Sequence, residues 1–576
     1  MRKYTVLPAI LALGAMPFAA TAQAPATATL TQEPATVTEV VDKIVAQEHA
    51  EMNTIRRYSP LVETYIQTVR PDKALGSAPD GDRYFLGRAS LDKGVQLEPL
   101  IKGDGVTGSD ARNVKQKFLA SIENIFSPAF LPRGFLQMIY LDEQGFDRQH
   151  YKFAYAGREF LGDVRCLIFD VDPLPNTGKG RFSGRIWVED QDYFIVRFNG
   201  SYGGSSRSSF YFNFDSWREN SAKNEWLPAY IYSEEGNVEY GVARHSAFRP
   251  FKSQTRLWGY DLNREQEEQT LSSVQVEGPK VKDQTESGNG YSPLQAKRAW
   301  GRLAEDNVAA KMQRMGLMAP YGEVDKVLET VVNNLEVTND LEVRPEVRCR
   351  VLMMSTLESF TMGHTIVLSR GLIDVLPDET SLAAVLAHEL GHVLLGHRMD
   401  TEFAFFNRVR FDEKETFHHF GFARNAEEEA AANQKGIELL KKSPYQDTSG
   451  TAQAFFVALQ KREKEVPNLI SPHLGDRVPK HWTSAADTNP QQTAKTANAI
   501  VALPLGARIK VAPWDDRLTM LKAQPEGAVA EYEKMPFEVA PFLVYLSRQN
   551  GNAMLNDTGA MAIKTDGDSA PAIAKP

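Results

Sequence analysis

The pattern of hydrophobic and polar positions changes its period near residue 277. From residue 83 to residue 276, apolar and polar residues alternate, and Gly-rich turns such as GSYGGSSRSS separate the alternating segments. In GRIWVEDQDYFIVRFNGSY the positions expected to face inward are Ile186, Val188, Phe194, Val196 and Phe198. The pattern predicts an antiparallel, β-rich domain over 83–276, and no catalytic constellation is visible in it.

From Leu294 the pattern becomes helical, beginning with LQAKRAWGRLAEDNVAAKMQRMG. The strand-like stretches RPEVRCRVLMMST and HTIVLSRGLIDVL then precede a strongly apolar helix, and residues 398–465 have a largely helical pattern. The expected fold class is therefore α+β. We expect the β-rich domain to be followed by a mainly helical domain with a small sheet over 294–485.

The first residues have the layout of a secretory signal peptide. Arg2 and Lys3 precede the apolar run TVLPAILALGAMPFAA and the small-residue site Ala20-Thr21-Ala22, so cleavage is expected after Ala22. An uncleaved membrane anchor is the alternative. We expect an exported chain, either periplasmic or fully secreted, with no membrane span after cleavage.

The remaining segments differ in composition. We expect residues 23–82 to form a flexible leader that runs into a helical segment, with the helix at 41–71. A linker is expected at 277–293, a mixed C-terminal extension at 486–548 and a disordered tail at 549–576. Cys166 and Cys349 both lie in strand-like sequence, and they either form one disulfide or remain two separate buried thiols.

Composition narrows the class of partner. The 576 residues are 42% hydrophobic and 24% charged, which is typical of a globular protein. The formal net charge is −9 and no long basic run occurs, so a nucleic-acid partner is not expected.

The stretch LAAVLAHELGHVLLGH, residues 382–397, places polar residues in an apolar helix. His388 and His392 are four positions apart, so both imidazoles lie on one helix face and can reach one metal ion. The spacing is HExxH, and Glu389 is the candidate general base for a zinc-activated water. Buried histidines beside a buried carboxylate require compensation, and a metal ion supplies it.

The residues alone leave the third ligand open. Ten positions after His388, where one class of zinc protease has a third histidine, stands Arg398, and His397 is one residue too early. A later acidic run offers Glu427, Glu428 and Glu429. We expect His397 to cap the carbonyls at the end of the helix, and His418 and His419 to lie in a loop.

Residues 358–397 resemble the gluzincin metallopeptidase family, which includes CAAX prenyl proteases, HtpX-like quality-control proteases and periplasmic β-barrel assembly-enhancing proteases. In that family the third zinc ligand lies in an E-x-x-A-D pattern followed by a Gly. Glu429-Ala430-Ala431-Ala432-Asn433, with Gly436, is similar to this pattern. The resemblance implies Glu429 as the third ligand, one Zn²⁺ per chain and a zincin-type fold.

The chain departs from the family at two points. The family's aspartate is Asn433 here, which can still accept a hydrogen bond from a ligand histidine but carries no charge. The family's later His-Pro-x-x-x-x-Arg motif reads SPHLGDR, so Ser471 replaces the histidine while Pro472 and Arg477 fit. Arg477 is a candidate for stabilising either the oxyanion or the fold. His473 or His481 is a candidate substitute for the missing histidine.

The resemblance implies a zinc metalloendopeptidase, in our interpretation an exported enzyme of envelope protein quality control that acts on unfolded or misassembled proteins. His364–Ser369 lies where the family has an edge strand beside the metal, to which a peptide can add; an ordinary core strand is the alternative. A chaperone-like or binding protein with a latent zinc site is the second hypothesis, and a non-peptidase zinc hydrolase is the third. The front domain loosely resembles the curved sheets of bacterial lipoprotein carriers, but a plain β domain of unknown role is the default interpretation of its pattern.

Overall fold

The computed structural model describes residues 36–73, 76–92, 94–101, 135–143, 145–178, 180–203, 213–222, 224–235, 250–261, 292–397, 404–405, 413–478, 504–505, 508–521 and 537–548. The predicted signal peptide, nearly all of the linker and the predicted C-terminal tail lie outside the described residues. Among the described helices, none is both long and apolar enough to cross a membrane.

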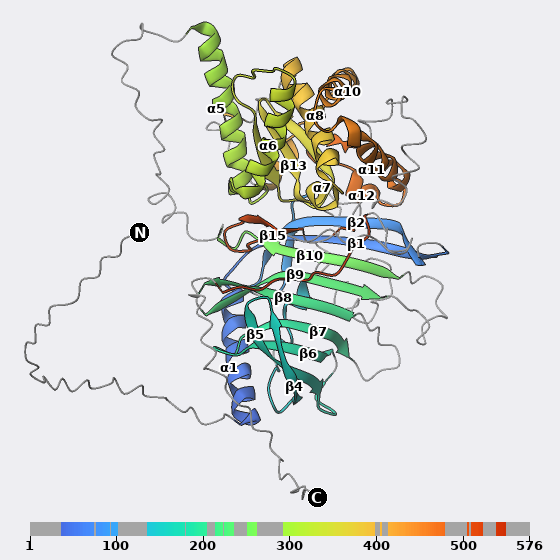
Figure 1. Ribbon diagram of the computed structural model, residues 1–576. Helices are drawn as coiled ribbons and strands as arrows, with labels where there is room; N and C mark the ends of the chain where they lie inside the picture. The colour runs from blue at the N-terminus through green and yellow to red at the C-terminus, as the bar shows by residue number, and fades with distance from the viewer. Residues whose placement is uncertain are drawn as a thin grey trace, which may run out of the picture. The chain divides into compact units, whose positions relative to one another are not determined.

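The first domain is a ten-stranded sheet, in which every strand runs antiparallel to its neighbours (Figure 1). The strands follow the spatial order β3-β2-β1-β10-β9-β8-β7-β6-β5-β4. Their bounds are β1 Leu61–Asp72, β2 Gly76–Ser90, β3 Gln96–Pro99, β4 Tyr151–Leu161, β5 Val164–Pro173, β6 Arg181–Glu189, β7 Ile195–Gly203, β8 Asn213–Ala222, β9 Glu225–Glu235 and β10 Phe251–Trp258. The predicted antiparallel β-rich domain is confirmed, and all five residues expected to face inward are buried.

The expected helix over 41–71 is wrong in its second half. Helix α1 covers Val37–Ile55, and the chain then enters β1. The sheet therefore begins before residue 83. The first seven residues of β1, LVETYIQ, are all buried, so both faces of the strand are covered and no alternation of polar and apolar residues marks it as a strand.

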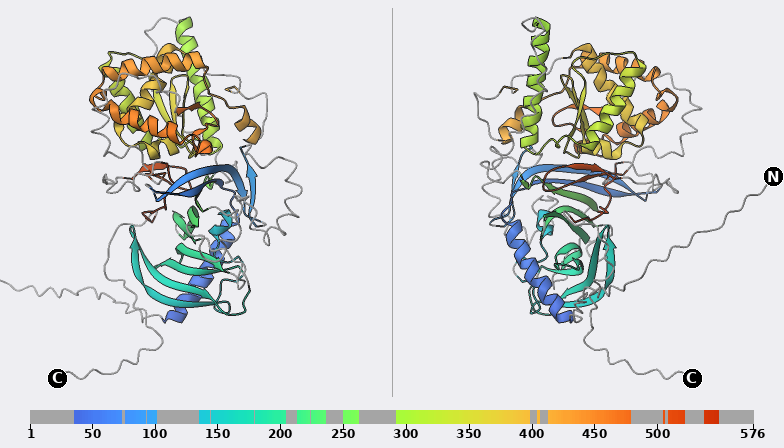
Figure 2. Two further views of the ribbon diagram at one scale, coloured as in Figure 1. Left: turned by 90° about the vertical axis from the view of Figure 1, so that its right-hand side faces the viewer. Right: turned by 60° about the vertical axis from the view of Figure 1, so that its left-hand side comes forward.

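Helix α1 and the C-terminal segment pack on opposite faces of the sheet. On β8, Arg218 bonds to Glu48 of α1, with Nη1–Oε2 at 2.6 Å, whereas the next residue, Glu219, pairs with Lys510. Successive side chains of a strand point to opposite faces, so these partners lie on opposite sides. Figure 2 shows α1 running along the curved part of the sheet.

The second domain is mainly helical and holds a small four-stranded sheet, as predicted. The sheet has the order β11-β13-β12-β14, and short 3₁₀ turns occur at Gln137–Ile139 in the first domain and Gln446–Thr448 in the second. The elements are α5 Pro293–Arg314, α6 Glu323–Thr338, β11 Arg348–Leu352, β12 Glu358–Met362, β13 Thr365–Ser369, α7 Arg370–Val375, α8 Glu379–Leu395, α9 Glu413–His419, α10 Ala426–Lys441, α11 Ser449–Arg462, α12 Pro467–Ile470 and β14 Asp476–Arg477.

Strand β13 is an inner strand, so the expected edge strand at His364–Ser369 is wrong. It pairs in parallel with β11 and antiparallel with β12, and all of its side chains are buried. The alternative of an ordinary core strand describes it. The sequence could not distinguish the two, because strand order within a sheet depends on contacts that are distant along the chain.

The C-terminal extension returns to the front sheet. Strands β15 (Ile509–Val511) and β16 (Leu518–Met520) form a hairpin, and residues 537–548 cross the sheet. Gln67 on β1 and Gln254 on β10 both donate side-chain hydrogen bonds to this crossing segment, at Phe537 O (2.6 Å) and Ala540 O (2.7 Å). The hairpin also touches the second domain, since Ile509 N donates to Asp374 of α7.

Both cysteines are free and buried, Cys166 on β5 and Cys349 on β11. The chain therefore has two separate thiols rather than the disulfide considered as an alternative. Burial raises the pKa of both thiols, as expected for cysteines that fill space in a core.

Candidate metal centre

Helix α8 carries the HExxH residues and is well defined at both ends. The Asp378 side chain accepts a hydrogen bond from Ser381 N at 2.8 Å and so caps the first turn. Gly396, with φ 70° and ψ 31°, ends the helix in the left-handed conformation that glycine adopts most readily. Between these ends the helix is buried, including His388, Glu389 and His392, whose residues are at most 1% exposed.

Three side chains converge at the end of this motif. His388 Nε2 lies 3.1 Å from His392 Nε2, and Glu429 of α10 brings its carboxylate to 3.6 Å from His388 Nε2 and 3.4 Å from His392 Nε2. Ligand atoms placed tetrahedrally around zinc, each at about 2.0–2.1 Å, are about 3.3 Å apart. The two Nε2 atoms and the two carboxylate oxygens, Oε2 toward His388 and Oε1 toward His392, therefore lie at about the spacing of ligand atoms around one zinc ion.

The hydrogen bonds of His388 fix its tautomer. Its Nδ1 lies 3.0 Å from Asn433 Oδ1, and an amide oxygen can only accept, so the ring proton is on Nδ1. His388 Nε2 then presents a lone pair toward His392 Nε2. A cation between these nitrogens satisfies both rings, which is the arrangement common around zinc-bound histidines.

Two glycines allow α8 and α10 to approach closely. A Cβ atom on Gly391 would lie 2.7 Å from Ala432 O, and one on Gly436 would lie 3.0 Å from the His388 backbone. Asn425 caps α10 by accepting from Glu427 N and Glu428 N at 3.0 and 2.9 Å. This placement selects Glu429 from the acidic run and brings it to the histidines.

The three carboxylates of the acidic run have different surroundings. Glu427 is exposed and Glu428 is partly exposed, whereas the Glu429 side chain is 17% exposed and turns toward the histidines. The residues alone did not decide among the three glutamates, and the geometry favours Glu429 as the third ligand. No other group of three His, Cys, Asp or Glu side chains in the described part of the chain comes together in this way.

His397 does not cap the helix carbonyls with its side chain, contrary to expectation. Its Nδ1 lies 2.7 Å from His392 Nδ1, while the turn at Gly396 supplies the helix end. Burial and the neighbouring His392 lower the pKa of His397. The expected loop for His418 and His419 is also wrong, since both lie in α9.

His473 lies at the contact with the front sheet. Its ring stacks on Tyr84 of β2, with centroids 5.3 Å apart, and burial lowers its pKa. The backbone N–H groups of His473, Leu474 and Gly475 all donate to Glu358 Oε2, at 3.0–3.2 Å. These contacts favour a structural role for His473, and its predicted catalytic role gains no support from them.

The remaining motif residues are placed only in part. In the pairing of β14 with β12, the backbone of Arg477 lies opposite that of Glu358. The side chain of Arg477 and all of His481 lie outside the described residues. Ser471 N donates to Pro467 O at 2.8 Å at the end of α12. The role of Arg477 therefore stays a prediction.

Sequence reasoning missed two polar contacts near the site. One is the pairing of His397 with His392. The other is Arg424, which donates from Nη2 to Thr361 O and Oγ1, both at 3.0 Å, and so binds to strand β12. No fixed sequence spacing predicts either contact. The one visible signal was the presence of a third histidine, His397, at the end of the HExxH helix.

Comparison with known proteins bears on this geometry. Residues 322–473 match Peptidase family M48. The matched segment runs from the start of α6 to His473 and contains all three converging side chains. The predicted resemblance to a gluzincin metallopeptidase family is confirmed at the level of M48, which indicates metallopeptidase activity that in this family depends on zinc.

A comparison with curated proteins gave no match. Two solved structures are similar in part. A DUF1329 family protein from Desulfovibrio piger has 13% identity and a TM-score of 0.21, covering 40% of this chain and 95% of that chain. The Pseudomonas aeruginosa MucA/MucB complex has 7% identity and a TM-score of 0.12, covering 38% and 93%. At these scores neither carries an argument here.

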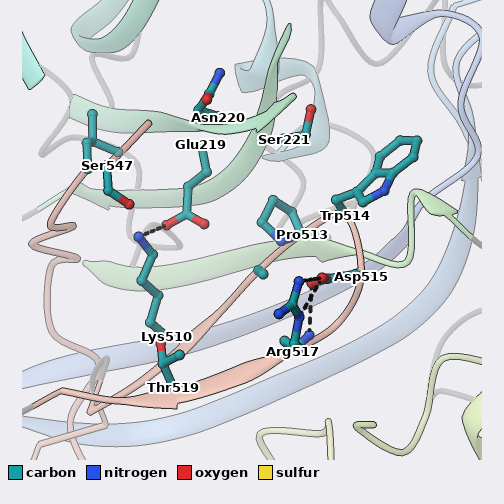
Figure 3. Close-up of a pocket in the computed structure, with 12 residues that line it drawn as sticks. Glu219, Asn220, Ser221, Lys510, Pro513, Trp514, Asp515, Arg517, Thr519 and Ser547 are labelled. Carbon is teal, nitrogen blue, oxygen red and sulfur yellow. Dashed lines mark hydrogen bonds and ion pairs between the residues drawn. The ribbon is translucent and has the colours of Figure 1, made fainter. Parts of the chain in front are cut away.

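A cavity of about 390 Å³ lies outside the M48 segment, between β8 and the C-terminal hairpin (Figure 3). Its charged lining groups form the pairs Glu219 with Lys510 and Asp515 with Arg517. Burial raises the pKa of Glu219 to about 7. Because each charge has an opposite partner within the lining, the cavity shows no preference for a charged ligand.

Proposed function

We propose that this protein is a zinc-dependent metalloendopeptidase whose metal is held by His388, His392 and Glu429. The observation that carries the proposal is the convergence of these side chains. The two Nε2 atoms are 3.1 Å apart, and the Glu429 carboxylate lies 3.6 Å from His388 Nε2 through Oε2 and 3.4 Å from His392 Nε2 through Oε1, distances close to those between ligand atoms of one tetrahedral ion. The match of the surrounding residues to Peptidase family M48 supports the same reaction.

Each side chain has a distinct task. The two imidazoles and the Glu429 carboxylate hold the ion, and the Asn433 contact keeps His388 in the ligating tautomer. Zinc bound here supplies a Lewis acid that polarises a peptide carbonyl and increases the acidity of a water molecule. Glu389 takes the proton from the attacking water and later gives it to the leaving amine.

The burial of Glu389 suits this task. The residue is 0% exposed and follows His388 directly on α8. The apolar neighbours of the helix keep bulk water out of the region where charge develops.

We further propose that the enzyme is exported and takes part in quality control of envelope proteins, with unfolded or misassembled proteins as substrates. The signal-like segment that ends at Ala22 supports export. Because β13 is paired on both sides, a substrate peptide cannot add to it as a further strand. A periplasmic location fits this role better than full secretion.

A binding or chaperone-like protein with a latent site is the second candidate function. Two observations favour it: Asn433 provides a neutral partner for His388, and Ser471 replaces the histidine of the family's later motif. This candidate predicts binding of unfolded protein that persists in Glu389→Gln, without turnover in the wild type.

Zinc content of purified Glu429→Ala, measured beside Glu427→Ala, tests the ligand assignment. Both changes remove one carboxylate from the same turn of α10, but only Glu429 faces the histidines. We expect about one zinc per chain in the wild type and in Glu427→Ala, and strong loss in Glu429→Ala, as for removal of a direct ligand. Equal zinc content in the two variants would refute the assignment.

A further inference from the structure

His397 is bound to His392 through both its backbone and its side chain. The left-handed Gly396 turns the chain back, so that His397 N donates to His392 O at 3.1 Å, the six-residue closure of a Schellman motif. The same turn brings the two Nδ1 atoms to 2.7 Å, with ring planes 65° apart. The side-chain contact therefore follows from the helix end that the backbone dictates.

We propose that His397 is a positioning residue for the second zinc ligand. Its Nδ1 accepts the Nδ1–H proton of His392 and so holds Nε2 of His392, with its lone pair free, toward His388 and Glu429. This inference rests on the proposed function, because it requires a metal ion at the three converging side chains.

The assignment follows from a proton count. Only one proton can lie between the two Nδ1 atoms. If His397 supplied it, His392 would carry its own proton on Nε2, pointing at His388 Nε2 only 3.1 Å away, and could not bind a metal. If His392 supplies it, Nε2 is free to ligate. Zinc binding thus selects the arrangement in which His397 is a neutral acceptor with its proton on Nε2.

The two ligand histidines then have different kinds of outer partner. His388 donates to an amide oxygen, Asn433 Oδ1, and His392 donates to an imidazole nitrogen. Both acceptors are neutral, so neither adds negative charge to the site. The single carboxylate among the ligands, Glu429, and the adjacent Glu389 supply the charge that balances the cation.

Two substitutions separate hydrogen bonding from ring packing. His397→Phe keeps a flat ring but removes the acceptor, and His397→Gln removes the ring but restores an acceptor oxygen. His49→Phe, at an exposed histidine on α1, is the matched control. Zinc affinity is measured by competition with a chelator, and the thermal stability of the metal-free proteins is measured beside it.

We expect zinc affinity to fall roughly 10–100-fold in His397→Phe, as for other outer partners of ligand histidines, and to recover mostly in His397→Gln. The control and the metal-free stabilities should not change. Zinc binding in His397→Phe within about twofold of the wild type would overturn the inference while leaving the proposed function intact. Absence of zinc in the wild type would instead overturn the proposed function, and the inference with it.

The wild-type protein gives an independent test that needs no variant. Long-range ¹H–¹⁵N spectra of the zinc-loaded chain report which ring nitrogen of each histidine carries a proton. The inference requires a proton on Nδ1 of His392 and on Nε2 of His397. A proton on Nδ1 of His397 would contradict it.

Discussion

Glu63 on β1 accepts a hydrogen bond from Arg370 Nη2 at 2.7 Å, and both residues are buried at the contact between the front sheet and the helical domain. The same carboxylate accepts from Ser355 N, Ser355 Oγ and Tyr84 OH. A buried carboxylate with this many donors is strongly tied to its surroundings. Arg370 begins α7, the short helix that precedes α8, so the sheet anchors the chain just before the candidate site.

Removing this charge should weaken the joint between the domains. Glu63→Leu leaves Arg370 buried without its main partner, and we expect a loss of about 3–5 kcal/mol in the free energy of unfolding. Asp170→Asn is the control, because Asp170 pairs with Arg185 at an exposed site and should cost about 1 kcal/mol or less. Chemical denaturation of both variants measures the difference in the free energy of unfolding. Equal losses in the two variants would show that the contact between Glu63 and Arg370 does not stabilise the joined domains.

The glycines between α8 and α10 should not tolerate alanine. A Cβ on Gly436 or Gly391 meets backbone atoms of the opposite helix, so each change should separate the helices, weaken zinc binding and lower stability. Gly301 on α5 is the matched control, since a Cβ there has nothing within 4 Å. Gly301→Ala should stabilise the chain by about 0.5–1 kcal/mol through helix propensity alone. Stabilisation by Gly436→Ala would show that the helices are not in close contact.

The neutral partner of His388 should limit zinc affinity. Asn433→Asp restores a charged acceptor at the same position, so we expect tighter zinc binding than in the wild type. Asn433→Leu removes the acceptor and should weaken binding by roughly 10–100-fold. Chelator competition at one pH compares the three proteins, and weaker binding in Asn433→Asp would contradict the role assigned to this contact.

A buried acid of helix α1 predicts how stability changes with pH. Burial, the largest cause, raises the pKa of Glu51 from 4.5 to about 8, although Arg218 opposes the shift. The folded state thus binds its proton more tightly than the unfolded state does. The resulting stabilisation is full below pH 4.5 and is lost as the pH rises to about 8.

Glu51→Gln removes this titration and can still accept the hydrogen bond from Trp226 N. The variant should therefore gain stability relative to the wild type as the pH rises from about 4.5 to about 8. Thermal unfolding at several pH values measures the difference. A difference that does not depend on pH across this window would contradict the account.

The parts of the site that sequence could predict are those set by helical spacing. His388, Glu389 and His392 follow from a local repeat, whereas Glu429 is separated from them by a long segment and needed the family resemblance. The pairing of His397 depends on the left-handed turn at Gly396, which the residue pattern permits but does not require. The inner position of β13 and the strand identity of β1 depend on which neighbours cover them. The contacts of β1 include Ser355 and Phe537, which are far from it along the chain, so the local sequence does not reveal them.

The central claim is that a zinc ion bound at His388, His392 and Glu429 hydrolyses peptide bonds with Glu389 as the base. The most direct measurement is the cleavage of unfolded casein by zinc-loaded wild type and by zinc-loaded Glu389→Gln, with the zinc content of both determined. The account predicts equal zinc in the two proteins, cleavage by the wild type, and a rate at least about 10²-fold lower in the variant. Equal cleavage by both proteins, or a fully zinc-loaded wild type that cleaves nothing, would contradict it.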